Sequence, residues 1–169
     1  MKKTVIKRSI TVNASKQKVW DALADFGIVQ NLSPNIKKSY LTSTDSIGLG
    51  SMRHCDFYSM GASVDEKIIE WNEGKLMRIE LYNPKNLPMI RDMEALFELE
   101  EKNDRTFIKG TFEYGVSNTI GRIFNKLQME KMNTKSWVAF LAGIKHNLES
   151  GEKIDNKTRL NLEAVEQLV

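Results

Sequence analysis

The sequence predicts one α+β domain in which a seven-stranded antiparallel sheet packs against a long helix near the C-terminus. Residues 119–149 contain no proline, follow polar residues that can cap a helix, and end just before Gly151. At ~1.5 Å per residue this helix would be about 45 Å long, longer than a small domain is wide, so it should lie across a sheet. Short alternating runs precede it, which gives the order of one strand, two short helices, six strands and the long helix.

Length and composition are those of an ordinary globular protein. The chain has 169 residues, of which 41% are hydrophobic and 28% are charged, so we expect one domain with a sizeable core. The N-terminus lacks the apolar region of a signal peptide, and no apolar run reaches membrane-spanning length. We therefore expect a cytoplasmic protein without membrane insertion. The net charge of +3 comes from lysines that alternate with acids, which argues against a nucleic-acid partner.

Cysteine and histidine are scarce in this chain. Cys55 is the single cysteine, and His54 and His146 are the two histidines. One cysteine excludes an internal disulfide, and the three side chains together are too few for a zinc site. We expect neither a metal nor another cofactor.

The first strand and the short helical region after it are predicted from apolar spacing. Residues 4–12 alternate between apolar and polar side chains, as in a half-buried strand. Ser15 should cap a helix that runs to Phe26 with one apolar side, and Gly27 should end it. Residues 32–35 then have the composition of a turn.

Six further strands are predicted by alternation and by the turn residues between them. Residues 72–74 and 102–104, for example, are turn sequences that favour hairpins. The predicted strands are residues 36–44, 51–58, 62–71, 75–83, 89–100 and 105–115.

The chain after Gly151 forms a separate unit in this prediction. Residues 1–151 are expected to form the domain, and residues 152–169 a tail. The tail is first polar and then carries Leu160, Leu162, Val165 and Leu168. This pattern favours a short accessory helix that docks on the same domain or on a second subunit in a homodimer.

The long helix has a polar interruption in its middle. Between two apolar stripes the same face carries Met129, Glu130, Asn133 and Thr134. One interpretation is that these residues face a cavity, and the other is that the helix bends there and they face water. The stripes are Ile120, Ile123, Phe124 and Leu127, and then Val138, Leu141, Ile144 and Leu148.

The inward faces of the strands also carry residues that a solid core would not contain. Glu66 shares a face with Val64, and a buried carboxylate needs a partner, a raised pKa or a wet pocket. Arg91 is a candidate counter-ion, while an edge position near solvent would explain Glu66 equally well. Gly110 lacks a side chain and leaves room for another group to approach. Other inward positions on these strands include Ile79, Met93 and Phe112.

Six segments then follow one another in a specific order. They are ITVNASKQKVWDALADF, LSPNIKKS, GLGSMRHC, EKIIEWNEG, LP before a strand, and SWVAFLAGIKHNLESGE. Together they resemble the START-like or SRPBCC superfamily, especially its bacterial proteins of the polyketide cyclase/dehydrase and lipid-transport type. The resemblance covers the chain to about Gly151.

That resemblance implies a helix-grip fold, in which a curved sheet wraps the C-terminal helix around a cavity for a hydrophobic ligand. It also implies that loops 59–61 and 86–88 gate the cavity. The positions that it places inward are Cys55, Phe57, Glu66, Gly110, Phe112, Met129, Asn133 and Trp137.

Three functions are consistent with these features. The first is a carrier or sensor for a small hydrophobic molecule, held by apolar residues such as Trp137 and oriented by Glu66, Asn133 or Arg91. The second is a polyketide cyclase or dehydrase in which Glu66 acts as acid or base and Arg53 or Arg91 polarises a carbonyl. The third is a protein-binding chaperone co-regulator that uses an outer surface. The sequence favours binding, because it offers Glu66 no second acid or base.

Overall fold

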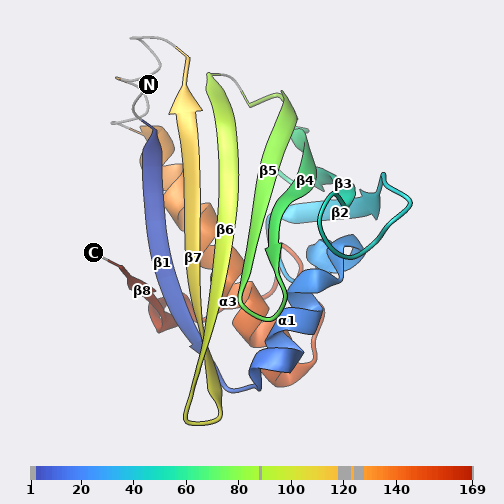
Figure 1. Cartoon of the computed structure of the whole chain (residues 1–169). Coiled ribbons are helices and arrows are strands. Elements are labelled where there is room, and N and C mark those ends of the chain that lie inside the picture. The colour runs from blue at the N-terminus through green and yellow to red at the C-terminus, as the bar shows by residue number, and fades with distance from the viewer. Residues whose placement is uncertain (1–2, 88, 118–122, 124–127, 169) are drawn as a thin grey trace.

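The computed structural model describes residues 3–87, 89–117, 123 and 128–168. Figure 1 shows a curved sheet with the long helix α3 lying across one of its faces. The strands lie in the order β2-β3-β4-β5-β6-β7-β1-β8, and each neighbouring pair is antiparallel. The α+β helix-grip fold predicted from the sequence is therefore confirmed.

The elements follow the expected order, and most strand ends lie within three residues of the predicted ones. Alternating burial explains this agreement, because strands such as β1 and β6 bury one face and leave the other more exposed. The strands are β1 (Thr4–Val12), β2 (Ile36–Leu41), β3 (Met52–Phe57), β4 (Ser63–Asn72), β5 (Leu76–Lys85), β6 (Ile90–Lys102), β7 (Arg105–Val116) and β8 (Val165–Gln167). The helices are α1 (Lys16–Ala24), the 3-10 helix η1 (Phe26–Asn31), α3 (Glu130–Ser150) and the 3-10 helix η3 (Leu162–Ala164).

Helix α1 begins where the sequence predicts and ends earlier. The Ser15 side chain accepts a hydrogen bond from the Lys18 N–H at 3.3 Å, as an N-cap does. The helix ends at Ala24, and Gly27 lies inside η1, so the prediction that Gly27 ends the helix is wrong. The apolar side of α1 contacts the sheet through Trp20, whose ring packs edge-on against Trp71 at 4.7 Å. Helix α1 and the 3-10 helix η1 close one end of the space between the sheet and α3.

Helix α3 ends as expected, at Gly151, whose left-handed backbone (φ 78°) terminates it. The first part of the predicted helix, residues 119–122 and 124–127, lies outside the described residues. Ile123 is helical, but its side chain is 61% exposed rather than part of a buried stripe. Further along, Leu141 and Ile144 are fully buried against the sheet.

The tail differs from its prediction. The helical part is a single turn, η3, and the chain then forms the short strand β8, which pairs with β1 from Arg8 to Ile10. The sheet therefore has eight strands rather than seven. Ile154, at the start of the tail, is buried and donates its N–H to the Asn31 carbonyl at 3.0 Å. The tail thus packs on its own domain.

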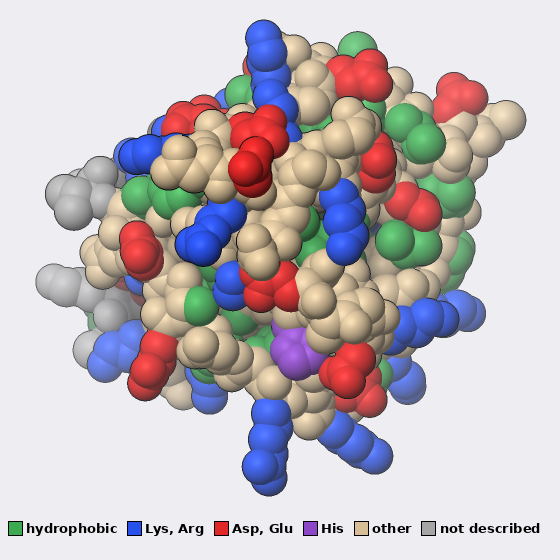
Figure 2. Space-filling model, turned by 90° about the horizontal axis from the view of Figure 1, so that it is seen from below, with side chains coloured by type: hydrophobic (Ala, Val, Ile, Leu, Met, Phe, Trp, Pro, Cys, Tyr) green, Lys and Arg blue, Asp and Glu red, His purple; other side chains and the backbone are tan. Residues whose placement is uncertain are grey.

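The face of the molecule seen from below is mixed in charge. In the view from below, acidic and basic side chains are interspersed, with apolar side chains in small separate groups (Figure 2). This matches a net charge of only +3. No helix in the described part of the chain is long and apolar enough to cross a membrane.

Candidate ligand-binding cavity

A cavity of about 360 Å³ lies between the concave side of the sheet and α3. That volume falls within the range of ligand pockets, roughly 300–1,000 Å³. Most of the lining is apolar, with aromatic rings from the strands and the helix. The apolar residues of this lining include Phe57, Val64, Ile79, Leu81, Met93, Phe97, Phe112, Trp137 and Phe140.

Trp137 forms one wall of the cavity and is held in place by the sheet. Its indole N–H donates to the Gly110 carbonyl on β7 at 3.1 Å. The ring stacks on Phe112, with centroids 5.7 Å apart, and lies 5.4 Å from Phe97. A Cβ on Gly110 would lie 3.0 Å from Trp137. The room expected beside Gly110, which has no side chain, is therefore occupied by side chains of α3. Gly110 does not line the cavity.

Glu66 is buried and has a partner, which is Arg53 rather than Arg91. The two are cross-strand neighbours on β4 and β3, and each is only 5% exposed. Arg53 Nε donates to Glu66 Oε2 at 2.6 Å, and Arg53 Nη2 contacts the same oxygen. Burial of either charge alone would be costly, so the pair explains how both are tolerated.

Arg53 is fixed by further contacts with η1. Its Nη1 donates to the Phe26 carbonyl at 3.1 Å, and its guanidinium carbon lies 3.8 Å from the centre of the Phe26 ring. Both Arg53 and Glu66 line the cavity. The cavity therefore contains a fixed ion pair in a largely apolar wall.

Arg91 lies outside the cavity, so its prediction as the counter-ion of Glu66 is wrong. Its side chain is 45% exposed and lies 3.8 Å from Asp92. The cause is an irregularity in the β6–β7 register between Arg91 and Glu94, where Asp92 has a left-handed backbone (φ 49°). This irregularity breaks the alternation, so that Ile90 and Met93 line the cavity and Arg91 does not.

Cys55 and Met129 are buried but do not line the cavity. Burial, with a contribution from the Glu66 carboxylate, raises the pKa of the Cys55 thiol far above its ordinary value. This thiol is therefore neutral and packs as part of the core. In the part of the chain that the structure describes, no three His, Cys, Asp or Glu side chains are grouped to hold a metal ion.

Asn133 contributes an unpaired polar group to the cavity. Its side-chain Nδ2 is buried and has no hydrogen-bond partner among the described residues. A buried amide without an acceptor is costly, and such groups in native proteins often mark a binding position. The polar interruption of α3 thus faces the cavity at Asn133.

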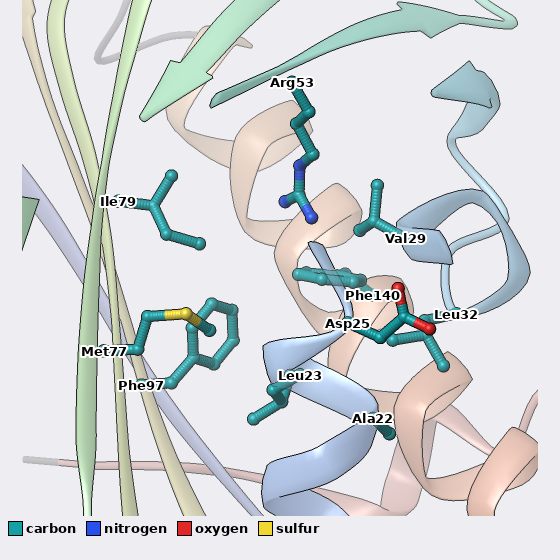
Figure 3. Close-up of a pocket in the computed structure, with 10 residues that line it drawn as sticks. All are labelled: Ala22, Leu23, Asp25, Val29, Leu32, Arg53, Met77, Ile79, Phe97 and Phe140. Carbon is teal, nitrogen blue, oxygen red and sulfur yellow. The ribbon is translucent and has the colours of Figure 1, made fainter. Parts of the chain in front are cut away.

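The inner end of the cavity is closed by α1 and η1. A void of about 10 Å³, near the size of one water molecule, lies there. Figure 3 shows the Arg53 guanidinium reaching into this region between Ile79 of the sheet and Val29 of η1, with Phe140 of α3 nearby. Arg53 lines both spaces, so the ion pair stands at the inner end.

The outer end is bordered by the loop that contains Met60, by the loop that contains Asn86, and by α3. Met60 and Met132 line the cavity although their side chains are 61% and 52% exposed, so they stand at its mouth. The two loops are joined by Asn86, whose Nδ2 donates to the Gly61 carbonyl at 3.0 Å. Met60 and Asn86 both have positive φ values (55° and 53°), and non-glycine residues adopt this conformation at a cost.

The structure therefore brings together most of the predicted site residues. Those that line the cavity are Phe57, Val64, Glu66, Ile79, Met93, Phe112, Asn133 and Trp137. Cys55, Arg91, Gly110 and Met129 do not. Phe97 and Phe140 were not among the predicted site residues, although alternation along β6 places Phe97 on the inward face and the spacing of Phe140 from Trp137 indicates Phe140.

The chain belongs to the polyketide cyclase / dehydrase and lipid transport family, whose sequence model matches residues 3–149. Truncated norcoclaurine synthase from Thalictrum flavum has a similar structure. Its TM-score is 0.69 at 19% identity, covering 90% of this chain and 96% of that one. A protein from Thermus thermophilus has a TM-score of 0.70 at 14% identity, covering 88% and 99%. Ara h 8.0201 has a TM-score of 0.64 at 13% identity, covering 88% and 99%. No curated protein matched the sequence.

Proposed function

We propose that this protein binds a small hydrophobic molecule in the cavity between the sheet and α3, as a carrier or sensor. The observation that supports this most is the cavity itself, of about 360 Å³ with mainly apolar and aromatic walls. Such a space would collapse or fill with side chains if the interior served packing alone, because protein cores are close-packed. The family to which the chain belongs includes lipid-transport proteins, which agrees with this function.

Binding is a better account of the polar groups than catalysis. Glu66 is the one carboxylate that lines the cavity within the described residues, and its Oε2 is engaged by Arg53. A general base has to be within reach of the substrate proton and free to accept it. If a cyclase or dehydrase reaction is found, Glu66→Gln should remove the acidic limb of its pH–rate dependence, where a general base becomes protonated, and an unchanged profile would exclude Glu66 as the base.

Native mass spectrometry of gently purified protein is the direct test. A bound molecule should appear as added mass, and a hydrophobic probe such as an anilinonaphthalene dye should bind at a ratio of one per chain. The matched variants are Ala95→Phe, which fills the cavity from β6, and Lys67→Phe, which places the same ring on the exposed side of β4. Ala95→Phe should weaken dye binding by roughly tenfold or more, and Lys67→Phe should not. Equal dye binding by both variants would contradict the proposal.

Asn133 gives a second test, which separates stability from affinity. Asn133→Leu removes the buried amide that lacks a partner, so the ligand-free protein should become more stable by about 1 kcal/mol. The same change should weaken binding of any ligand that carries a hydrogen-bond acceptor. Denaturant unfolding and dye displacement measure the two effects, and a loss of stability would show that Asn133 serves the fold instead.

A further inference from the structure

The charges in the cavity compensate one another. Arg53 and Glu66 are its two charged lining residues among those that the structure describes. We propose that the ligand is an uncharged molecule bearing a hydroxyl group, and that the cavity discriminates against carboxylates and amines. This inference rests on the proposed function, since it specifies the chemistry of the molecule bound at the same site.

The ion pair is arranged so that each charge is compensated by the other. Both Arg53 Nε and Nη2 contact Glu66 Oε2, and Arg53 Nη1 donates to the Phe26 carbonyl. The guanidinium also lies on the Phe26 ring at 3.8 Å, a favourable place for a cation. Each partner is 5% exposed, so water screens this pair little.

A charged ligand would disturb that balance. A carboxylate would bring a second negative charge beside Glu66, and an ammonium group would bring a second positive charge beside Arg53. Desolvation of either ligand would then be uncompensated, which is costly in an apolar cavity. No lysine lines the cavity in the described part of the chain, and Arg91 points elsewhere. At the inner end, exposed Asp25 is the one further charged residue, and it would repel a carboxylate.

Polar atoms of the lining remain available to a neutral ligand, and two of them belong to Glu66 and Asn133. Both contacts from Arg53 go to Glu66 Oε2, so they do not engage Glu66 Oε1. Asn133 Nδ2 is buried and lacks an acceptor. A hydroxyl group can donate to Glu66 Oε1 or accept from Asn133 Nδ2 without carrying a charge into the cavity. An alcohol can therefore form hydrogen bonds with these two side chains without bringing a charge into the cavity.

The test compares three ligands with one alkyl chain: decanol, decanoate and decylammonium. Their affinities are measured at neutral pH by displacement of a cavity-bound hydrophobic dye and by calorimetry. We expect decanol to bind at least ~10-fold more tightly than either ion. Decanoate or decylammonium binding as tightly as decanol would overturn the inference while leaving the proposed function standing. Failure of all three ligands and of the dye to bind would overturn both.

Reciprocal variants show whether the ion pair sets this preference. Glu66→Gln leaves the Arg53 charge unpaired, so the affinity ratio of decanoate to decanol should rise by roughly tenfold. Arg53→Gln leaves Glu66 unpaired, so the ratio of decylammonium to decanol should rise by a similar factor. Either variant alone suffices if the other does not fold, and circular dichroism establishes which variants fold.

The double variant Arg53→Gln with Glu66→Gln is the matched control. It contains no charge at either position, so it should not gain affinity for either ion. An affinity ratio that stays at its native value in a folded single variant would show that the pair is purely structural, and would overturn the inference.

Discussion

At the scale of single residues, Gly110 shows how the cavity wall is assembled. The glycine lies on β7 directly beneath Trp137, and its carbonyl accepts the indole N–H. Because Gly110 has no Cβ, the indole and Leu141 can approach the strand closely. The size of the cavity thus depends on a residue that does not line it.

Gly110→Ala should destabilise the protein by overpacking. The new methyl group would lie 3.0 Å from Trp137 Cζ2 and 3.1 Å from Leu141 Cδ2, and such crowding costs about 1–3 kcal/mol. Displacement of the indole should also change the near-ultraviolet circular dichroism. Gly27→Ala is the control, because the nearest contact there is an ordinary 3.6 Å. Equal unfolding free energies for the two variants would show that α3 shifts to make room.

The prediction of individual cavity residues from the sequence was correct for some residues and wrong for others. Val64, Ile79, Met93 and Phe112 were found because alternation along a regular strand fixes the face of every side chain. Phe57 was found through the resemblance to the superfamily. Arg91 failed because one irregularity in β6 reverses that alternation, and nothing in the local sequence marks it. The partner of Glu66 could be chosen only once strand register placed Arg53 opposite it.

At the scale of elements, α3 is positioned by a close contact with the loop after η1. Gly143 lies in the buried part of the helix, where a Cβ would come 2.3 Å from the Leu32 carbonyl oxygen. Backbone atoms cannot yield as a flexible side chain can. Glycine is therefore required here for packing, although it is a poor helix former.

Gly143→Ala provides a test in which two effects oppose one another. Helix propensity alone would stabilise the variant by about 1 kcal/mol. The contact with Leu32 should outweigh this gain and destabilise the protein by about 2 kcal/mol or more. Denaturant unfolding measures the net effect, with exposed Lys135→Ala on the same helix as the control that should be nearly neutral. A more stable Gly143→Ala variant would mean that the loop moves away readily.

The C-terminal end of α3 is tied to the segment between β1 and α1 by Glu149. Its Oε1 accepts from the Asn13 N–H at 2.7 Å and from Lys145 Nζ at 2.6 Å. Burial tends to raise the pKa of Glu149, but the hydrogen bonds from Lys145 and Asn13 outweigh this, so the pKa lies below its ordinary value. The carboxylate form is therefore bound more favourably in the folded state than in the unfolded state.

The lowered pKa of Glu149 makes the free energy of unfolding depend on pH. A carboxyl group whose pKa is lower in the folded state stabilises the fold at pH values above its pKa in the unfolded state. This stabilisation is lost as the pH falls through its pKa in the folded state. Glu149→Gln should cost about 1 kcal/mol at neutral pH, and the difference from the native protein should vanish on acidification. Glu73→Gln, in the exposed turn between β4 and β5, is the control. A difference that persists at low pH would assign the effect to packing.

At the scale of the whole molecule, the sequence predicted the architecture but not the eighth strand at the edge of the sheet. Seven strands and α3 were found because each is long enough to carry its own periodic pattern. Strand β8 has three residues, too few for any pattern. Its stability comes from pairing with β1, which lies at the opposite end of the chain, and such pairing cannot be inferred from local sequence. The spacing of Leu160, Leu162, Val165 and Leu168 predicted a short helix, whereas the structure has one helical turn at Leu162 and a strand from Val165.

Removal of residues 160–169 tests what β8 contributes to the whole molecule. The truncation keeps Ile154 and the turn after it, but removes Val165 from its place against the core and exposes the backbone of β1. We expect a loss of about 1–2 kcal/mol in unfolding free energy from the lost burial. We also expect self-association at high concentration, because β1 becomes an open sheet edge.

The point variant Leu162→Ala separates this role from that of a helix docked on a partner. Leu162 is exposed in η3, so its truncation should change stability by less than about 0.5 kcal/mol. Chemical denaturation and light scattering measure both variants at matched concentrations. A truncated protein that is as stable and as monomeric as the full chain would show that β8 does not protect the sheet edge. If Leu162→Ala alone reproduced the effect of the truncation, the apolar side of the tail, and not its pairing with β1, would hold it in place.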